Sequence, residues 1–385
     1  MGPGDRTRVH DGPDAAGRSV VVCSLEEWGT VRRRLRIMVD QLAALDPGIR
    51  LLYVAPPVDV PHALAHGDRP GAAGGRLEQV HPRIHVLRPR KWLPRVAGPW
   101  ADRSLGHQVE RAARRLGLVD PLLWVNDAAY ARFAVESGHP VLYDVTDDWL
   151  LAPRPERQRR RLAADDALLV ARADAVVVCS PDLARTRGRS REVDLIPNGV
   201  DVELFRTPQA RPADLGPGPV AVYVGTLHEE RIDLPLLREL AAARPDLRIV
   251  LVGPSSLDPA ATADLASAGV QLLGPRPYHQ VPAYLQHADV VIVPHVVSPF
   301  TESLDPIKAY ECAAAGRPTV ATPVAGFRSM GPPVTTADRD GFAAAVSGAL
   351  TSGSVGPTVG AVPSWQDRTE ALAAVMDRIR SGRGR

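Results

Sequence analysis

The sequence predicts an α/β protein built from two doubly wound domains, each around a parallel sheet. Short runs rich in β-branched residues recur along the 385 residues, and each is followed by a longer stretch with helical periodicity. The runs are almost continuously apolar, as expected of parallel strands that helices cover on both faces. Eleven such runs are too many for one typical open sheet, so we expect two Rossmann-like sheets.

The candidate strands follow one another in a regular order. Those of the first half span residues 19–24, 49–55, 83–88, 121–126, 140–145 and 174–180. Those of the second half span residues 220–225, 247–253, 270–274, 289–295 and 318–323. Helical patterns such as 30–45 and 235–243 lie between them, and this alternation indicates βαβ units.

Changes in composition along the chain predict the domain boundaries. Residues 206–219 are rich in Pro and Gly without periodicity, which is typical of a linker. We therefore expect a first domain over 19–205, a second domain over 220–363 and a C-terminal helix over 364–385 that could cross back to the first domain. Residues 1–18 are polar and are expected to form a disordered tail without the apolar core of a signal peptide.

The overall composition is that of a globular protein in a reducing compartment. Hydrophobic residues make up 45% and charged residues 23%, and the formal net charge of +2 gives no reason to expect a nucleic-acid partner. Cys23, Cys179 and Cys312 stand in apolar surroundings without metal-ligand spacing, which favours buried free thiols. No stretch approaches the roughly 20 apolar residues of a membrane span, so we expect a cytoplasmic protein.

The segment 289–323 carries the most informative pattern. A strand ends at His295, a polar loop follows, and a helix is expected to begin near Pro306 and to end at Gly316. The start of such a helix offers free N–H groups and a partial positive charge, which together bind anions. Glu311, about one turn further on, could accept hydrogen bonds from a ribose diol. The alternative is that Glu311 is an ordinary solvated helix residue and Lys308 a surface charge.

This segment resembles the donor-binding helix of retaining GT-B glycosyltransferases of the group 1, or family 4-like, type. Its variant PxK…E…AAGxPxV is similar to that of bacterial teichuronic-acid-type glycosyltransferases, and LIPNGVDVELF, VYVGTLHEERID and LVGP are similar to further motifs of the family. The resemblance implies a GT-B fold, with the two domains facing a central cleft. It also implies a donor linked to UDP, GDP or dTDP, no metal or other cofactor, and front-face displacement.

Many members of this family have two glutamates eight residues apart, and the resemblance implies a role for each. Glu311 matches the second, which holds the donor ribose. Ser303 stands at the first position, near the transferred sugar, and Glu302 is displaced by one residue. Two alternatives follow: either Glu302 substitutes through a shifted loop, or the backbone of Asp305, Pro306, Ile307 and Lys308 contacts the diphosphate and sugar hydroxyls.

The family also places an arginine and then a lysine after the first strand of the second domain, where they neutralise the diphosphate. Here Thr226 stands at the arginine position and Arg231 at the lysine position, with Lys308 as a second candidate cation. The alternative for Arg231 is a surface ion pair with Glu229 or Asp233. Further donor-side candidates are the strand-end glycines Gly225 and Gly253, and Arg276, which would lie under the nucleobase.

The first domain is expected to present the acceptor. Asp147 or Asp148 could accept a hydrogen bond from the incoming hydroxyl, or simply cap the following helix. We do not interpret Asp144, Asp147 and Asp148 as a metal site, because the second-domain motifs already supply a diphosphate site. Other acceptor-side candidates lie at strand ends or in the loop after the first strand: Glu27, Trp28, Gly29, Asn126 and Asp127.

Several charged or titratable positions are more often structural than functional. Residues 32–34, three consecutive arginines, are expected on a solvated face, and His295 in a structural role. The basic stretches 88–95 and 154–161 are expected at the surface, although Trp92 amid arginines could rest on an anionic membrane. Such a peripheral contact at the inner membrane face would suit a lipid-linked acceptor.

Taken together, the sequence predicts an enzyme that moves a hexose-type sugar onto a hydroxyl group. The acceptor could be a cell-surface polysaccharide intermediate or a small natural product. The alternatives are a GT-B nucleotide-sugar epimerase or phosphorylase, and a degenerate, non-catalytic partner that only binds a sugar nucleotide.

Overall fold

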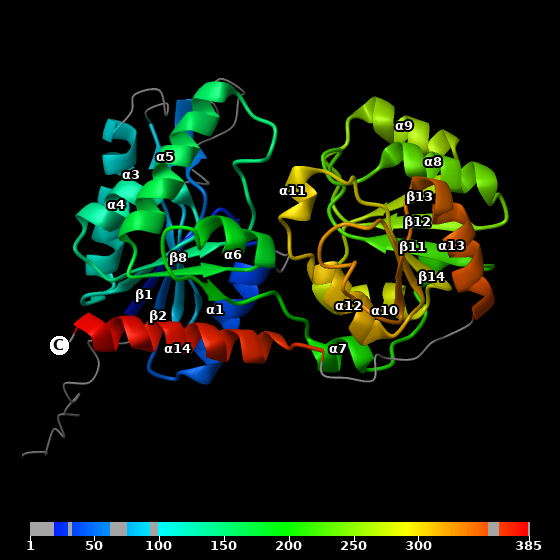
Figure 1. The fold of residues 1–385 in the computed structure, drawn as a ribbon. Helices are drawn as coiled ribbons and strands as arrows, with labels where there is room; N and C mark the ends of the chain where they lie inside the picture. The colour runs from blue at the N-terminus through cyan, green and yellow to red at the C-terminus, as the bar shows by residue number, and fades with distance from the viewer. Residues whose placement is uncertain (1–18, 30–32, 62–74, 93–98, 353–361, 384–385) are drawn as a thin grey trace, which may run out of the picture.

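A computed structural model describes residues 19–29, 33–61, 75–92, 99–352 and 362–383, and these form two lobes, each around its own sheet (Figure 1). The predicted disordered tail, 1–18, lies outside the described residues. All eleven predicted strands form, and they divide between the two sheets at the expected place. The predicted α/β fold with two Rossmann-like sheets is therefore confirmed.

The first sheet has eight strands in the order β10-β9-β8-β7-β1-β2-β5-β4. All neighbours are parallel except β4, which pairs antiparallel with β5. The strands are β1 (Ser19–Cys23), β2 (Arg50–Val54), β4 (Leu77–His81), β5 (Ile84–Leu87), β7 (Leu122–Val125), β8 (Val141–Val145), β9 (Ala175–Val178) and β10 (Asp194–Leu195). A separate parallel pair is formed by β3 (Val58–Asp59) and β6 (Arg90–Lys91).

The second sheet has six strands, all parallel, in the order β13-β12-β11-β14-β15-β16. Strand order reverses between β11 and β14, as it does between β1 and β7 in the first sheet. In such sheets the crevice at the carboxyl ends of these strands is where ligands bind. The strands are β11 (Val220–Val224), β12 (Arg248–Val252), β13 (Val270–Gly274), β14 (Val290–Val293), β15 (Thr319–Ala321) and β16 (Val334–Thr336).

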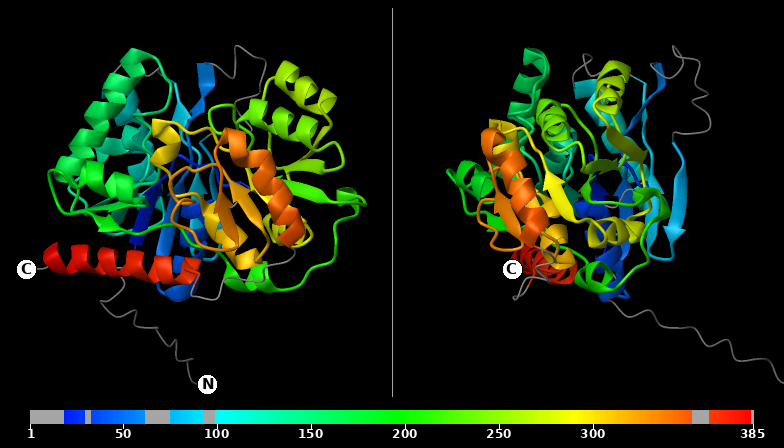
Figure 2. Two further views of the ribbon diagram at one scale, coloured as in Figure 1. Left: turned by 45° about the vertical axis from the view of Figure 1, so that its right-hand side comes forward. Right: turned by 90° about the vertical axis from the view of Figure 1, so that its right-hand side faces the viewer.

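Helices cover both faces of each sheet (Figure 2). Along β1, Val21 and Cys23 join one apolar cluster while Val20 and Val22 join another, so the strand is buried on both sides as its unbroken apolar run predicts. The first lobe carries α1 (Arg34–Leu45), α3 (Pro99–Arg115), α4 (Ala131–Glu136), α5 (Glu156–Arg172) and α6 (Pro181–Arg187). The second carries α7 (Val202–Arg206), α8 (Leu234–Ala243), α9 (Pro259–Ser267), α10 (Val281–Gln286), α11 (Pro299–Glu302), α12 (Ile307–Ala315) and α13 (Arg339–Ser352).

The chain passes between the domains earlier than the predicted linker 206–219. Phe205 of α7 and Leu215 of a 3₁₀ turn are fully buried in one cluster with Val220 and Val222, so the Pro-rich segment packs onto the second domain. The crossing lies near Gly199. A Cβ there would stand 2.7 Å from the backbone of Ser364, because the two passages of the chain run side by side at this point.

The last helix, α14 (Trp365–Arg383), returns to the first domain and lies beside α1 (Figure 1). Its buried residues Trp365, Leu372 and Val375 share a cluster with Leu35 and Met38 of α1. The C-terminal segment is thus part of the first domain's core. Within the described residues, no helix combines the length and the apolar character that crossing a bilayer requires.

We expect Leu372→Ala in α14 to lower the free energy of unfolding by about 2–5 kcal/mol, the usual cost of truncating a buried leucine. Leu372 is 0% exposed. Glu370→Ala, on the exposed side of the same helix, should change the stability by less than about 0.5 kcal/mol. Urea unfolding of the two variants measures the difference, and equal midpoints would show that α14 does not stabilise the first domain.

Candidate functional site

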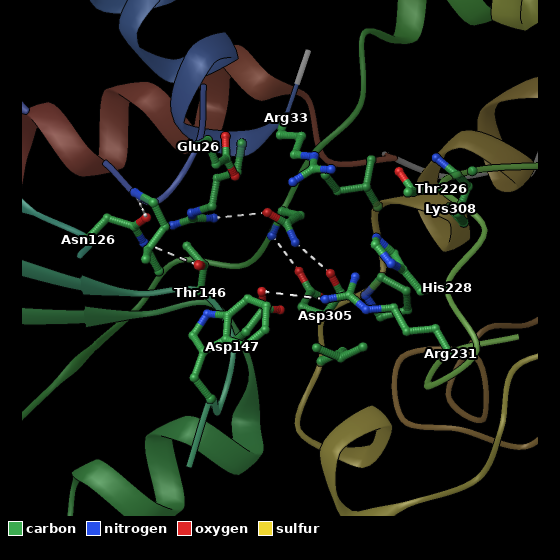
Figure 3. Close-up of a pocket in the computed structure, with 18 of the residues that line it drawn as sticks. Glu26, Arg33, Asn126, Thr146, Asp147, Thr226, His228, Arg231, Asp305 and Lys308 are labelled. Atoms are coloured by element: carbon green, nitrogen blue, oxygen red, sulfur yellow. Dashed lines mark hydrogen bonds and ion pairs between the residues drawn. The ribbon is translucent and has the colours of Figure 1, made fainter. Parts of the chain in front are cut away.

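A cavity of about 680 Å³ lies between the domains, where the carboxyl ends of both sheets face each other (Figure 3). Both domains contribute to its wall. The predicted site residues that line it are Asn126, Asp127, Asp147, Gly225, Thr226, Arg231, Gly253, Arg276, Asp305, Pro306, Ile307, Lys308 and Glu311.

Helix α12 begins at the edge of this cavity, as its sequence predicts. Pro306 is its N-cap, and Gly316, with a φ of 68°, ends it in the left-handed region that glycine adopts without strain. Ile307 and Lys308, in its first turn, line the cavity. Since the first N–H groups of a helix have no partner within the helix, this end offers hydrogen-bond donors and a partial positive charge to the cavity.

Glu311 forms the wall one turn behind the helix start. It is 2% exposed, and Lys308 Nζ donates to its Oε2 over 2.8 Å. The carboxyl group thus pairs with a cation, and its oxygens can accept further hydrogen bonds from the cavity side.

Gly225 and Gly253 lie where β11 and β12 end, and both line the cavity. A Cβ at Gly253 would lie 2.0 Å from the Gly225 carbonyl, and the φ of Gly253 is 148°, so the close approach of the two strand ends requires glycine at 253. A Cβ at Gly225 would lie 2.5 Å from the Tyr223 hydroxyl, so a larger residue there would have to displace the Tyr223 ring.

Arg231 reaches across the cavity towards the first domain. Its Nη2 lies 3.8 Å from Asp147 Oδ2, and its guanidinium lies 5.3 Å from the centre of the Phe300 ring (Figure 3). Asp233, one of its two expected surface partners, instead pairs with Arg339. Burial in the cavity wall raises the pKa of Asp147 to about 6, although Arg231 and Arg33 attract the charged form.

The three carboxylates that follow β8 point in different directions. Asp144 is fully buried and accepts from the Trp124 indole N–H over 3.1 Å. Asp148 does not line the cavity, in contrast to our expectation, because both terminal nitrogens of Arg187 hold its carboxylate at 2.8 and 2.9 Å. Only Asp147 presents its carboxylate to the cavity.

Ser303 and Glu302 also lie outside the cavity wall. Ser303 is fully buried, its hydroxyl donates to the Phe300 carbonyl over 2.7 Å, and its own carbonyl accepts from Ser180 across the domains. Glu302 forms a bidentate ion pair with Arg328. The structure therefore disfavours substitution by Glu302 and leaves the backbone of 305–308 on the cavity wall.

The expected loop residues Glu27, Trp28 and Gly29 lie away from the cavity as well. Trp28 packs edge-on against Tyr53, with ring centres 4.9 Å apart, and Glu27 lies 3.5 Å from Arg88. These contacts fill the outer side of the loop, while Gly29 is exposed.

Glu26 takes their place in the cavity wall (Figure 3). The Tyr53 hydroxyl donates to its carbonyl over 2.8 Å and fixes the loop. Burial raises the pKa of Glu26 to about 7, against the attraction of Arg33 and with added repulsion from Asp147. Glu26 and Glu27 are adjacent and equally acidic, so the sequence alone does not tell which of them faces the cavity.

Two of the expected side chains, those of Asn126 and Asp127, line the cavity, but their hydrogen bonds are made to the surrounding loops. The Asn126 amide donates to the Asp144 carbonyl over 3.0 Å and accepts from the Leu25 N–H over 3.3 Å. The Asp127 carboxylate caps a 3₁₀ turn by accepting from the Ala129 N–H. Both residues therefore shape the loops around the cavity.

The Arg276 side chain is likewise held by hydrogen bonds within the protein. Its guanidinium donates to Asp214 over 2.7 Å, to the Tyr284 hydroxyl over 2.9 Å and to the Leu273 carbonyl over 2.8 Å. The residue lines the cavity, but its charge is compensated within the second domain.

A buried network that the sequence did not reveal joins the domains beside the cavity. Arg34, which we expected on a solvated face, is 3% exposed and donates to Asn198 Oδ1 and to the Pro197 carbonyl, each over 3.2 Å. Asn198 in turn donates its backbone N–H and its amide to Asp305, each over 2.5 Å. Three successive arginines gave no signal that one of them would be buried, while LIPNGVD pointed only to the family.

His295 packs between Tyr223 and Phe327, is 7% exposed, and also lines the cavity. Burial, together with the positive charges of Arg231 and Lys308, lowers its pKa to about 3. The imidazole is therefore neutral. Over the residues that the structure describes, no three His, Cys, Asp or Glu side chains are grouped so that they could hold a metal ion.

Comparisons with known proteins agree with this geometry. Residues 218–352 match the family model for glycosyl transferases group 1. Over 343 residues, 81% of this chain and 83% of the relative, the sequence is 25% identical to TuaH of Bacillus subtilis, which is named a teichuronic acid biosynthesis glycosyltransferase.

Solved structures share the fold at lower sequence identity. HepE of Anabaena, solved in complex with UDP, superposes with a TM-score of 0.60 at 16% identity, over 95% of this chain and 98% of HepE. The UDP-forming α,α-trehalose-phosphate synthase of Burkholderia vietnamiensis superposes with a TM-score of 0.61 at 14% identity, over 94% of this chain and 93% of the synthase. The chain therefore has the two-domain GT-B fold of these structures, and within it residues 218–352 match the model for glycosyl transferases group 1.

Proposed function

We propose that this enzyme transfers a hexose from a uridine diphosphate donor to an acceptor hydroxyl with retention of configuration. The observation that carries the proposal is the start of α12, which opens into the interdomain cavity with the buried carboxylate of Glu311 one turn behind it. The choice of uridine is supported by HepE, which has been solved with UDP, with UDP and glucose, and with UDP-glucose.

The diphosphate would lie against the N–H groups of Ile307 and Lys308, at the positive end of the helix. Glu311, paired with Lys308, would accept hydrogen bonds from the two ribose hydroxyls. Arg231 lines the same cavity from the second domain and would stabilise the charge that develops on the departing diphosphate. We propose that Arg231 and Lys308 together neutralise this charge, so that transfer needs no metal ion.

In front-face displacement the acceptor attacks from the side on which the diphosphate leaves. The bond between the anomeric carbon and the phosphate oxygen breaks, a new glycosidic bond forms on the same face, and the departing phosphate oxygen takes the acceptor proton. No separate general base is then required. Asp147 would orient the acceptor hydroxyl by accepting its hydrogen bond, and its place opposite Arg231 supports this role.

The acceptor is proposed to be an intermediate of a cell-surface polysaccharide, on the basis of the name of the Bacillus relative. Such intermediates are carried on lipids at the inner face of the membrane. Trp92 and Trp100 of the first domain are 56% and 69% exposed, close in the sequence to Arg90, Lys91 and Arg103. Exposed indoles beside basic residues favour a peripheral contact with anionic lipid, so we propose that the enzyme acts in the cytoplasm against this surface.

We expect Glu311→Gln to weaken binding of UDP-glucose by about tenfold or more, because the neutral amide accepts weaker hydrogen bonds than a carboxylate. Isothermal titration calorimetry measures the dissociation constant, and circular dichroism verifies the fold. Glu302→Gln is the matched control, since Glu302 pairs with Arg328 outside the cavity. An unchanged dissociation constant in Glu311→Gln would remove the donor site from α12.

We expect kcat/KM for hydrolysis of UDP-glucose, with water as acceptor, to fall as the pH drops below about 6. The ionised Asp147 accepts a stronger hydrogen bond than the neutral acid and alone forms an ion pair with Arg231, and its pKa is about 6. Below this value the fall should approach about tenfold per pH unit. Asp147→Asn should be slow and lack this inflection. Glu26→Gln should keep the inflection near pH 6, which distinguishes the titration of Asp147 from that of Glu26 near pH 7. An inflection that remains in Asp147→Asn would argue against Asp147 as the titrating group.

A further inference from the structure

The first domain forms a further part of the cavity wall, next to Asp147. None of the residues that we propose to bind the donor belongs to this part. It comes from the loop after β8 and from α5 and α6, and it includes Tyr143, Trp149, Leu150, Arg154, Leu162 and Arg187. Arg154 opens the basic stretch 154–161, which we expected only as a solvated surface.

Arg154 is a cation that carries no carboxylate partner among the described residues. Its side chain is partly buried, and its Nε is out of contact with solvent and has no hydrogen-bond acceptor. The centre of its guanidinium lies 5.8 Å from the centre of the Trp149 ring. Burial lowers its pKa, and no neighbouring acid opposes this shift. A guanidinium in this state gains most from an anionic ligand.

The acids around Arg154 are engaged elsewhere. Asp148 and Asp166 both pair with Arg187, at 2.8 and 3.2 Å. Asp166 also accepts from the Tyr143 hydroxyl over 2.7 Å, and Asp147 faces Arg231. Rotation of the Arg154 side chain towards these carboxylates would therefore compete with charge pairs that are already formed.

The backbone keeps Arg154 at the cavity wall. Pro153 and Pro155 flank it, and a proline fixes its own φ and restricts the residue before it to extended conformations. Trp149, beside the guanidinium, is itself held against Phe300 of the second domain, with ring centres 5.6 Å apart. The arginine is thus preorganised in the cavity wall, without an internal partner.

We propose that this first-domain end of the cavity is a subsite for an anionic group of the acceptor, a phosphate or a carboxylate, bound by Arg154. The inference rests on the proposed function, because it places the acceptor opposite the donor in the same cavity. Leu150 and Leu162 provide apolar walls beside the charge. The chemistry fits a sugar phosphate, a uronic acid or a phosphate carried on a lipid, and it disfavours a neutral sugar or a cationic amine.

The test measures binding of small probes to the full chain saturated with UDP. Glucose 6-phosphate and glucuronate should bind at least about tenfold more tightly than glucose, as expected for one charge-assisted contact. Arg154→Gln should remove this preference, and Arg154→Lys should keep only part of it, because lysine lacks the bidentate fork. Arg160→Gln is the matched control: Arg160 lies on the adjoining helix, is 79% exposed and pairs with Glu156.

Farnesyl phosphate, as a further probe, distinguishes the source of the anion. Tighter binding of farnesyl phosphate than of glucose 6-phosphate, lost in Arg154→Gln, indicates a lipid-linked acceptor, and the reverse order indicates a soluble one. Equal binding of glucose and the anions, or equal anion binding by Arg154→Gln and the unaltered protein, overturns the proposal. The UDP dissociation constant is a separate readout: its loss in Glu311→Gln tests the donor site, and it should not change in Arg154→Gln.

Discussion

Partly buried hydrogen bonds between Asn198 and Asp305 hold the two domains together beside the cavity. Asn198 lies where the chain leaves the first domain, and Asp305 lies in the loop that leads into α12, so this contact ties the crossing directly to the start of that helix. Arg34 donates a hydrogen bond to the Asn198 side chain, and its Nη2 lies 3.5 Å from Asp144 Oδ1. Removing one member of such a network would leave a buried charge without its partner, which is strongly destabilising. The position of α12 relative to the first domain therefore depends on polar contacts that cannot be lost one at a time.

The same closeness of the domains sets the electrostatics of the cavity. Burial in walls from both sheets raises the pKa of Asp147 to about 6 and that of Glu26 to about 7, and lowers that of His295 to about 3. Between buried groups, each fixed charge acts on its neighbours more strongly than it would in solution. A cavity of this kind can stabilise a departing diphosphate with only two cations, provided that they are already in place.

The sequence predicted the fold, and the residues that line the second-domain side of the cavity, because their signals are local. Apolar runs predicted the strands. Pro306 and Gly316 mark the two ends of one short helix, and Glu311 lies between them. The acceptor side was harder, because the direction of a side chain there depends on a partner far away in the sequence. Asp148 turns from the cavity towards Arg187, 39 residues later, and Trp28 turns towards Tyr53. Nothing in three consecutive arginines distinguishes the buried Arg34 from an exposed neighbour.

This contrast reflects how the two halves of the site are built. In the proposed function, one helix start and two strand ends would bind a diphosphate and a ribose, groups that are common to many donors, so a short motif would be enough to identify them. The acceptor wall combines side chains from the loops after β1, β7 and β8 with α5 and α6, and each of these can change without disturbing the donor helix. Arg154, which lies between Pro153 and Pro155 and has no carboxylate partner among the described residues, belongs to this wall. Its charge is better explained by the molecule that enters the cavity than by the protein around it, and the acceptor should therefore be sought among anions.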